Sequence, residues 1–362
     1  MPIELRGQVR DVPLAVHGTP DHAELRRLGS CPAEVLDFSS NINAYGPSPA
    51  VRKAVLRTPL DRYPDDEARS LRLALAEYLG ISPRCILAAN GSSELIWLTA
   101  LTFLRPGNRV LVLGPTFAEY GRLAALVGVC LKNYFAQEER DFTPLPWQVR
   151  AVLDSWQPQL VFLCNPNNPT GASLAAHEIL DWSSNYQKTI FVVDESYISF
   201  ASHLGSAIDT RRNNLLVLRS MTKDYALAGL RLGYAVGAEE LITALAHVGP
   251  PWRVNALAQA AGVAALSDRE HLQRTLEKLA AAKIELMVAL RELGMQVLPS
   301  AAPFFLVRVD NGAAVRRALL HKGILVRDCA SFGLPHYVRI CTRRPEENAR
   351  LVAALREVCH GG

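Results

Sequence analysis

The chain has 362 residues, of which 49% are hydrophobic and 20% are charged. Such a chain can bury a large core without disulfides or metals, which excludes a disordered or fibrous protein. The formal net charge, 39 − 35 = +4, is spread over the whole sequence, too thinly for the clustered basic surface of a nucleic-acid-binding protein. The seven widely spaced cysteines, and nine histidines without metal-ligand spacing, predict free thiols in a reducing cytoplasm and no metal site.

No stretch approaches the roughly 20 consecutive apolar residues of a membrane span. Residues 1–13 mix charged with apolar side chains and contain no apolar signal core. We therefore expect a cytoplasmic protein that is neither secreted nor bound to a membrane.

Taken in chain order, apolar runs alternate with helical patterns through the first two thirds of the sequence. The runs predict strands at residues 110–113, 160–163, 190–193, 215–218 and 234–236. The helical patterns lie at residues 70–79, 92–104, 118–127 and 174–186. Near-continuous apolar strands that alternate with helices are typical of a mainly parallel sheet covered on both faces.

The last hundred residues follow a different pattern. A long helical stretch comes first, then strands and shorter helices, expected at residues 268–293, 304–309, 313–322, 337–341 and 345–358. We expect an α/β protein with a large domain over 50–265 and a smaller α+β domain over 266–362. Residues 1–49 are rich in loops and are expected to pack on the smaller domain or on a partner subunit.

The most informative segment follows the strand predicted at 215–218. Lys223 lies at the carboxyl end of that strand, where open α/β sheets bind ligands. Ser220 and Thr222 flank it, and Arg231 follows eight positions later. Hydroxyls and an arginine can hold a phosphate while the lysine amine reaches an aldehyde, as a lysine that binds pyridoxal phosphate requires. Taken alone, the lysine could equally be an ordinary surface residue.

The strand predicted at 190–193 ends in a carboxylate, Asp194, with Tyr197 three positions later. Asp194 could be a loop residue or a helix cap, but a pyridinium nitrogen also needs a buried carboxylate partner to stay protonated. Tyr197 could donate to the phenolic oxygen of the same ring. Glu195 between them is interpreted as a structural carboxylate.

Three further segments, each at the end of a predicted strand or the start of a predicted helix, contain candidate ligand-binding residues. Asn168 lies in the proline- and glycine-rich turn at 164–171, which can fix an amide donor beside a ring oxygen. Ser92 and Ser93 open a helix, where free N–H groups bind anions, although serine is also the ordinary N-cap. Phe117 follows the strand at 110–113 and could belong to the core or stack on a planar ring.

These segments, in this order, resemble the fold-type I, pyridoxal-phosphate-dependent aminotransferase superfamily, classes I and II, over nearly the whole chain. The resemblance implies that pyridoxal 5′-phosphate binds Lys223, with Asp194 beside the pyridinium nitrogen. Asn168 and Tyr197 would contact the ring oxygen, and Phe117 would stack on the ring. The phosphate cup would consist of Ser92, Ser93, Ser220, Thr222 and Arg231.

Members of this superfamily are homodimers with active sites at the subunit interface. Tyr63 matches a tyrosine that reaches the cofactor phosphate of the partner subunit. The resemblance therefore implies a homodimer with shared sites and a small anionic amino-acid phosphate as substrate. Because every catalytic position is filled, an inactive cofactor-binding regulator is disfavoured.

Two branches of the superfamily are similar to this sequence: threonine-phosphate decarboxylase of cobamide (vitamin B12) biosynthesis and histidinol-phosphate aminotransferase. The segment 37–43 looks like the decarboxylase, because the aminotransferase usually has Glu where Ile42 stands. His17 and Gly18, and the segments 251–258 and 324–330, also look like the decarboxylase. The resemblance thus favours decarboxylation of L-threonine O-3-phosphate to (R)-1-amino-2-propanol phosphate. Transamination of histidinol phosphate with 2-oxoglutarate is the alternative.

The resemblance also implies the substrate-binding residues, which are His17, Gly18, Asn41, Asn168, Arg327 and Arg339. Arg339 lies within an apolar strand, where an unpaired guanidinium would be costly and a bidentate anion would justify it. Threonine phosphate carries a carboxylate and a phosphate close together, so two arginines are expected to anchor it.

Overall fold

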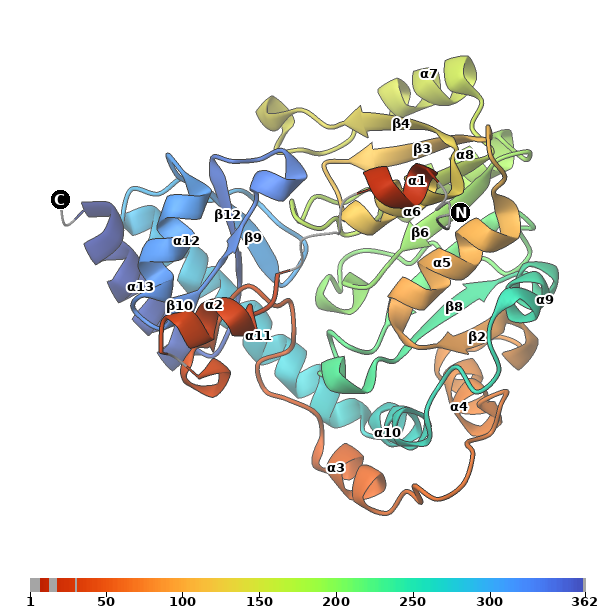
Figure 1. The fold of residues 1–362 in the computed structure, drawn as a ribbon, viewed down its shortest axis with the longest axis horizontal. Coiled ribbons are helices and arrows are strands. Elements are labelled where there is room, and N and C mark those ends of the chain that lie inside the picture. The colour runs from red at the N-terminus through yellow and green to blue at the C-terminus, as the bar shows by residue number, and fades with distance from the viewer. Residues whose placement is uncertain (1–6, 13–17, 30, 361–362) are drawn as a thin grey trace, which may run out of the picture.

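The computed structural model describes residues 7–12, 18–29 and 31–360, which form a larger and a smaller lobe (Figure 1). The larger lobe is built on a seven-stranded sheet in the order β2-β8-β7-β6-β5-β3-β4. All neighbouring pairs are parallel except the two that β8 makes. The strands are β2 (Ile86–Ala89), β3 (Arg109–Gly114), β4 (Cys130–Phe135), β5 (Leu160–Cys164), β6 (Ile190–Asp194), β7 (Leu215–Ser220) and β8 (Gly233–Gly237).

Helices cover both faces of this sheet. In β3, Val110 and Val112 belong to the core cluster under one set of helices, while Leu111 and Leu113 belong to a cluster on the opposite face, under α7 (Pro146–Trp156) and α8 (Ala176–Asn185). The first set is α5 (Gly91–Phe103), α6 (Ala118–Val127) and α9 (Glu239–Val248); the opposite face is also covered by α4 (Arg69–Leu79) and α10 (Ala256–Ser267). Burial on both faces explains why the central strands are apolar at nearly every position.

The smaller lobe contains a three-stranded antiparallel sheet in the order β11-β12-β9. Its elements are β9 (Phe304–Arg308), β11 (Arg327–Asp328), β12 (Tyr337–Cys341), α12 (Gly312–Leu320) and α13 (Pro345–His360). The 24-residue helix α11 (Arg269–Glu292) runs from beside α10 to the smaller lobe (Figure 1). Its Leu286 and Leu290 join the core of that lobe.

The N-terminal residues contact both lobes. Strand β1 (Leu36–Asp37) pairs in parallel with β10 (Ile324–Leu325) of the smaller lobe. Helix α2 (His22–Arg27) is joined to α12 by Glu24, whose two carboxylate oxygens accept from Arg316 at 2.9 and 2.5 Å. Helix α3 (Pro49–Leu56) packs on α10, and α1 (Gly7–Asp11) contacts α6. The domain limits at 49 and 265 stay a prediction.

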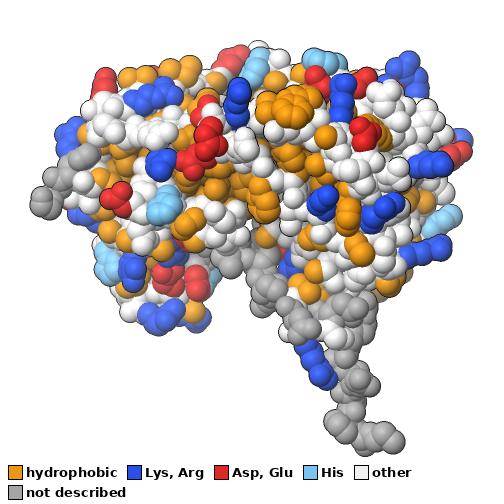
Figure 2. Space-filling model, turned by 90° about the horizontal axis from the view of Figure 1, so that it is seen from above, with side chains coloured by type: hydrophobic (Ala, Val, Ile, Leu, Met, Phe, Trp, Pro, Cys, Tyr) orange, Lys and Arg blue, Asp and Glu red, His pale blue; other side chains and the backbone are white. Residues whose placement is uncertain are grey.

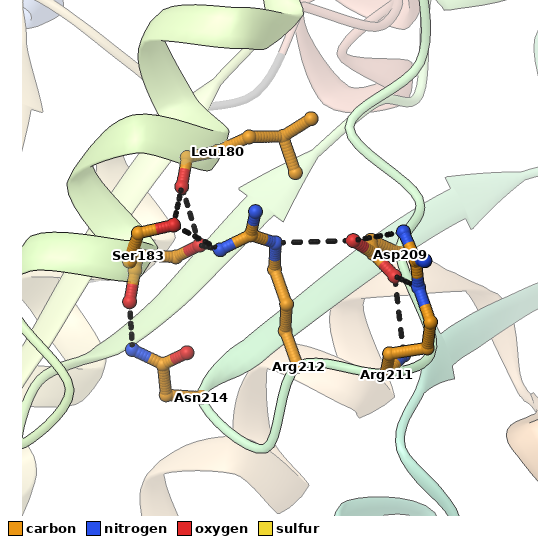
Figure 3. Close-up of polar contacts among 7 residues, drawn as sticks. Leu180, Ser183, Asp209, Arg211, Arg212 and Asn214 are labelled. Carbon is orange, nitrogen blue, oxygen red and sulfur yellow. Dashed lines mark hydrogen bonds and ion pairs between the residues drawn. The ribbon is translucent and has the colours of Figure 1, made fainter.

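The loop that leads into β7 is fixed to α8 by a cluster of polar contacts (Figure 3). Arg212 donates to Asp209 Oδ2 at 3.2 Å and to Ser183 Oγ at 3.0 Å. Asn214 Nδ2 donates to the Ser183 carbonyl at 2.9 Å. A hydrogen bond from Arg211 lowers the pKa of Asp209, which keeps this carboxylate charged. The cluster holds the start of β7, the strand that precedes the turn with Lys223.

The surface shows no single charged region on the face in Figure 2, where Lys and Arg side chains lie among acidic and apolar ones. Within the described ranges, no helix combines the length and apolar character that crossing a bilayer requires. All seven cysteines are free thiols.

Candidate active site

A pocket of about 380 Å³ opens at the carboxyl ends of the central strands and extends to the smaller lobe. Ligands of open α/β sheets bind at this edge. Most of the residues predicted for the site line it: Gly18, Asn41, Ser92, Ser93, Phe117, Asn168, Asp194, Tyr197, Ser220, Thr222, Lys223, Arg231, Arg327 and Arg339.

Two predicted residues are not among the described lining residues. Tyr63 is 78% exposed, and its ring stacks on Trp252 with centroids 4.5 Å apart. A contact of Tyr63 with a partner subunit therefore stays a prediction. His17 lies outside the residues that the structure describes.

Lys223 lies in the turn that follows β7. The turn is held by a hydrogen bond from Met221 N–H to the Leu232 carbonyl at 3.0 Å, and the Ser220 and Thr222 hydroxyls are 2.6 Å apart. Burial, together with the positive charges of Arg339 and Arg231, lowers the pKa of Lys223 to about 8. A lysine that loses its proton this readily is available as a nucleophile.

Asp194, at the end of β6, is oriented by three hydrogen bonds. Tyr120 O–H donates to Oδ2 at 2.7 Å, while the backbone N–H and the hydroxyl of Ser196 donate to Oδ1 at 2.9 and 2.5 Å. Burial raises the pKa of Tyr120 well above its usual value, so Tyr120 remains a neutral donor. Sequence reasoning missed both donors, although Tyr120 stands one helical turn after Phe117 and Ser196 two positions after Asp194.

One corner of the pocket is suited to an anion. Ser92 and Ser93 lie in the first turn of α5, whose free N–H groups favour negative charge, and Arg231 lies beside it. Gly91 has φ +79°, and a Cβ there would lie 2.8 Å from Arg231 Nη2. A Cβ at Gly233 would lie 2.7 Å from the Ser92 nitrogen. Both glycines are therefore needed for the close approach of these three segments.

Asn168 and Tyr197 are connected to the residues predicted to bind substrate. Arg339 Nη1 donates to Asn168 Oδ1, and Asn41 Nδ2 donates to the Tyr197 hydroxyl at 3.0 Å. Burial raises the pKa of Tyr197, so its hydroxyl is neutral. Phe117 lines the pocket at the start of α6, with its ring edge-on to Tyr120.

The two predicted arginines are direct cross-strand partners, Arg327 in β11 and Arg339 in β12. They are 5% and 4% exposed, and burial, followed by the charge of Arg339, lowers the pKa of Arg327. Two buried guanidinium groups side by side are stabilised by an anion between them. Arg339 Nη2 donates to the Ser39 carbonyl at 2.6 Å, but Arg339 Nε and Asn41 Oδ1 are buried without hydrogen-bond partners.

Gly18 lets the N-terminal segment pass close to the arginines. A Cβ at this position would lie 2.8 Å from the Ser39 carbonyl oxygen and 3.0 Å from Arg339 Nη2. Ser39 and Ser40 are in turn fixed by Asp37, which accepts hydrogen bonds from both hydroxyls at 2.6 and 2.5 Å. Sequence reasoning missed Ser39, because it contacts Arg339 through its backbone.

The described lining residues fit the chemistry of pyridoxal 5′-phosphate. The corner at Arg231 can hold a phosphate, the Lys223 amine can reach an aldehyde, and Asp194 offers a carboxylate to a ring nitrogen. The buried unpartnered atoms of Asn41 and Arg339 leave one acceptor and one donor for a further ligand.

Comparison with known proteins agrees with this geometry. The family described as aminotransferase class I and II matches residues 33–355. The chain is 37% identical over 359 residues to histidinol-phosphate aminotransferase 2 of Ralstonia nicotianae, covering 96% of this chain and 95% of the relative. A 37% identity to histidinol-phosphate aminotransferase of Symbiobacterium thermophilum extends over 97% of this chain and 98% of that protein.

Two solved structures are similar over most of their length. Histidinol-phosphate aminotransferase from Sinorhizobium meliloti, in complex with pyridoxal-5′-phosphate, superposes with a TM-score of 0.88 at 25% identity, covering 99% of this chain and 98% of that one. L-threonine-O-3-phosphate decarboxylase from Porphyromonas gingivalis superposes with a TM-score of 0.78 at 30% identity, covering 90% and 99%. The chain therefore belongs to the class I and II aminotransferases, which are pyridoxal-phosphate-dependent enzymes of fold type I.

Proposed function

We propose that this protein transaminates a small phosphorylated amine of the histidinol-phosphate type, with 2-oxoglutarate as the amino acceptor. The observation that carries the proposal is that one pocket contains Lys223 and Asp194 together with two anion sites. The first, the anion corner, is formed by Ser92, Ser93 and Arg231, and the second, the arginine pair, consists of Arg327 and Arg339. The relatives described above favour this reaction over the decarboxylation that the sequence motifs favoured.

When bound, pyridoxal 5′-phosphate supplies an electron sink for the electrons released at the carbon that bears the amino group. In this proposal Lys223 holds the cofactor and later moves the proton at that carbon. Asp194, oriented by Tyr120 and Ser196, would pair with the ring nitrogen, and Phe117 would pack on the ring. Asn168 and Tyr197 contact the ring oxygen. The cofactor phosphate is bound by Ser92, Ser93, Ser220, Thr222 and Arg231, with Tyr63 contributed by a partner subunit.

Substrates are proposed to bind at the arginine pair. 2-Oxoglutarate has two carboxylates and histidinol phosphate has one phosphate, so Arg327 and Arg339 can bind each compound in turn. Asn41 and Gly18 would lie over the bound anion, and the role of His17 there stays a prediction. These residues would orient the substrate against the bound cofactor, so their placement of the substrate would decide which reaction occurs.

Decarboxylation of threonine phosphate is a second candidate, which the composition of the pocket favours. Ile42 lines the pocket, and Asp194 is the sole acidic residue among its described lining residues. An imidazole therefore finds no free carboxylate there, whereas the methyl group of threonine phosphate suits Ile42. The carboxylate and the phosphate of threonine phosphate could also each bind one guanidinium of the arginine pair.

One experiment separates the two reactions. The enzyme loaded with pyridoxal 5′-phosphate is incubated with histidinol phosphate plus 2-oxoglutarate and, separately, with threonine phosphate, and glutamate and CO₂ are measured. Glutamate formation supports the first proposal, and CO₂ release without glutamate supports the second. Lys223→Ala should abolish either reaction, and borohydride should fix the cofactor to a peptide that contains Lys223. Labelling of another lysine would contradict both proposals.

A further inference from the structure

A buried asparagine outside the pocket holds the turn that carries Lys223. Asn43 is 3% exposed and is not among the described lining residues. Its backbone N–H donates to the Lys223 carbonyl at 2.9 Å, and its Nδ2 donates to the Asp224 carbonyl at 2.9 Å. Asn43 thus binds two consecutive carbonyl groups of the turn that carries Lys223, although it lies 181 positions before Asp224 in the sequence.

The turn's own backbone–backbone hydrogen bonds are longer than these. Ala226 N–H reaches the Lys223 carbonyl at 3.3 Å, and Leu227 N–H reaches the Met221 carbonyl at 3.2 Å. Because hydrogen bonds weaken with length, the two contacts from Asn43 hold the Lys223 and Asp224 carbonyls more tightly than the backbone–backbone hydrogen bonds within the turn hold its chain.

Asn43 also connects this turn to the smaller lobe. Its Nδ2 donates to Thr275 Oγ1 at 2.9 Å, and Thr275, 3% exposed, directs its own hydroxyl proton to the Leu272 carbonyl at 2.9 Å. Thr275 lies on α11, whose other end builds the core of the lobe that carries the arginine pair. The Asn43 Oδ1 accepts from Tyr45 N–H at 3.0 Å, so each polar atom of this side chain is engaged.

We propose that Asn43 is a positioning residue for the reaction, whose side chain acts on Lys223 through the neighbouring Asp224 carbonyl of the same turn, and that Thr275 ties this action to α11. The inference rests on the proposed role of Lys223. Small displacements of a reacting group cost large factors in rate, so a loosened turn should slow the chemical step more than it weakens substrate binding. It should also change the environment of the Lys223 nitrogen.

The test compares four variants loaded with pyridoxal 5′-phosphate. Asn43→Ala removes both side-chain contacts with the turn and α11, Thr275→Val removes the acceptor on α11, and Thr275→Ser keeps it. Thr189→Val is the matched control, because Thr189 is buried and its hydroxyl donates to the Pro158 carbonyl at 2.7 Å at the amino end of β6, away from the pocket. The readouts are the pH midpoint of the cofactor absorbance, kcat and KM, and the melting temperature.

We expect Asn43→Ala to shift the absorbance midpoint by about half to one pH unit. It should lower kcat about 10-fold or more while KM changes less than about twofold. Thr275→Val should act in the same direction, and Thr275→Ser should behave as the wild type. In the apoenzyme, amide hydrogen exchange over residues 221–227 should speed up in Asn43→Ala. Thr189→Val should lower only the melting temperature.

If Asn43→Ala and Thr275→Val lower only the melting temperature, as the control does, Asn43 has a structural role and the inference is wrong. If Asn43→Ala does not fold, Thr275→Val and Thr275→Ser decide the question alone. A wild type that takes up no cofactor at Lys223 would overturn the proposed function itself, and this is seen before any variant is compared.

Discussion

Lys223 is a buried amine between two guanidinium groups, and this environment links its protonation to stability. Its pKa is lowered from 10.5 to about 8 in the folded chain, by burial first and then by Arg339 and Arg231. Between about pH 8 and 10.5 the unfolded apoenzyme therefore binds more protons than the folded one, so stability rises with pH in this window. The gain amounts to about 3 kcal/mol at most.

Lys223→Met should remove this gain. We expect the free energy of unfolding of the wild-type apoenzyme, measured by urea denaturation, to rise from pH 8 to 10.5 relative to that of the variant. Lys283, whose pKa is also lowered to about 8 by burial, contributes equally to both proteins and cancels in the comparison. Parallel pH profiles for the two proteins would contradict the described environment of Lys223.

Substitution of Asp194 tests whether the negative charge of its carboxylate contributes to the reaction. In Asp194→Asn the amide oxygen can still accept from Ser196, but the NH₂ group that replaces Oδ2 cannot accept from Tyr120, and the side chain carries no negative charge for a ring nitrogen. Loss of such an electrostatic partner costs about 10²- to 10³-fold in kcat. We expect the variant to retain bound cofactor, seen by absorbance, and to lose turnover to this extent. Near-wild-type turnover with the cofactor bound would refute the assignment.

Several of the site residues that could be predicted from the sequence share one property: they lie at or just after the end of a strand, or they open a helix. Lys223 and Asp194 are examples, since the carboxyl ends of parallel strands meet at one edge of the sheet. Ser39 and Tyr120 could not be found in this way. Ser39 acts through its carbonyl, which any residue type provides, and Tyr120 is fully buried and has the periodicity of a core residue.

At the scale of elements, the short antiparallel pair of β11 and β12 places two arginines opposite each other. The sequence shows these arginines twelve positions apart, and the register of the two strands makes them neighbours. Under the proposed function, binding of a dianion would depend on the sheet of the smaller lobe, whereas binding of the cofactor phosphate would depend on α5 in the larger lobe. The two functions should therefore be separable by mutation.

Arg339→Ala should lower kcat/KM by about 10- to 150-fold for whichever substrate the enzyme accepts. This factor corresponds to the free energy of one hydrogen bond to a charged group. The variant should still retain bound cofactor, seen by absorbance, because Arg231 and not Arg339 lies in the anion corner beside Ser92 and Ser93. Arg308→Ala is the matched control in the same sheet, because Arg308 is exposed and pairs with Glu138 outside the pocket. Loss of cofactor in Arg339→Ala, or an equal effect of the control, would show that the assignment is wrong.

At the scale of the whole molecule, the α/β class and the mainly parallel sheet followed from the alternation of apolar runs and helical patterns. Strands β2 and β4 were not predicted. Strand β2 is only four residues long, and β4 lies at the edge of the sheet, where Lys132 and Asn133 interrupt the apolar pattern. The antiparallel direction of β8 was also not foreseen, because hydrophobic periodicity is the same in either direction.

The proposed homodimer leads to a test that needs two chains. If Tyr63 completes the site of the partner subunit, Tyr63→Phe and Lys223→Ala each impair both sites of their own dimers. A mixed dimer then contains one site with Lys223 and with Tyr63 from the other chain. We expect refolded mixtures of the two variants to regain activity, approaching one native site per mixed dimer, whereas each variant alone stays impaired. Mixtures no more active than Tyr63→Phe alone would argue against a shared site.

The parallel pairing of β1 with β10 has a consequence for biosynthesis. The paired residues Leu36 and Ile324 are 324 − 36 = 288 positions apart. At translation rates of about 5–20 residues per second, the partner strand is made about 15–60 s after β1. During this interval β1 leaves the ribosome with its backbone hydrogen-bonding groups unpaired, so the smaller lobe is completed only when synthesis is nearly finished. The ribosome-bound chain thus exposes an open strand edge that chaperones or a neighbouring nascent chain can bind.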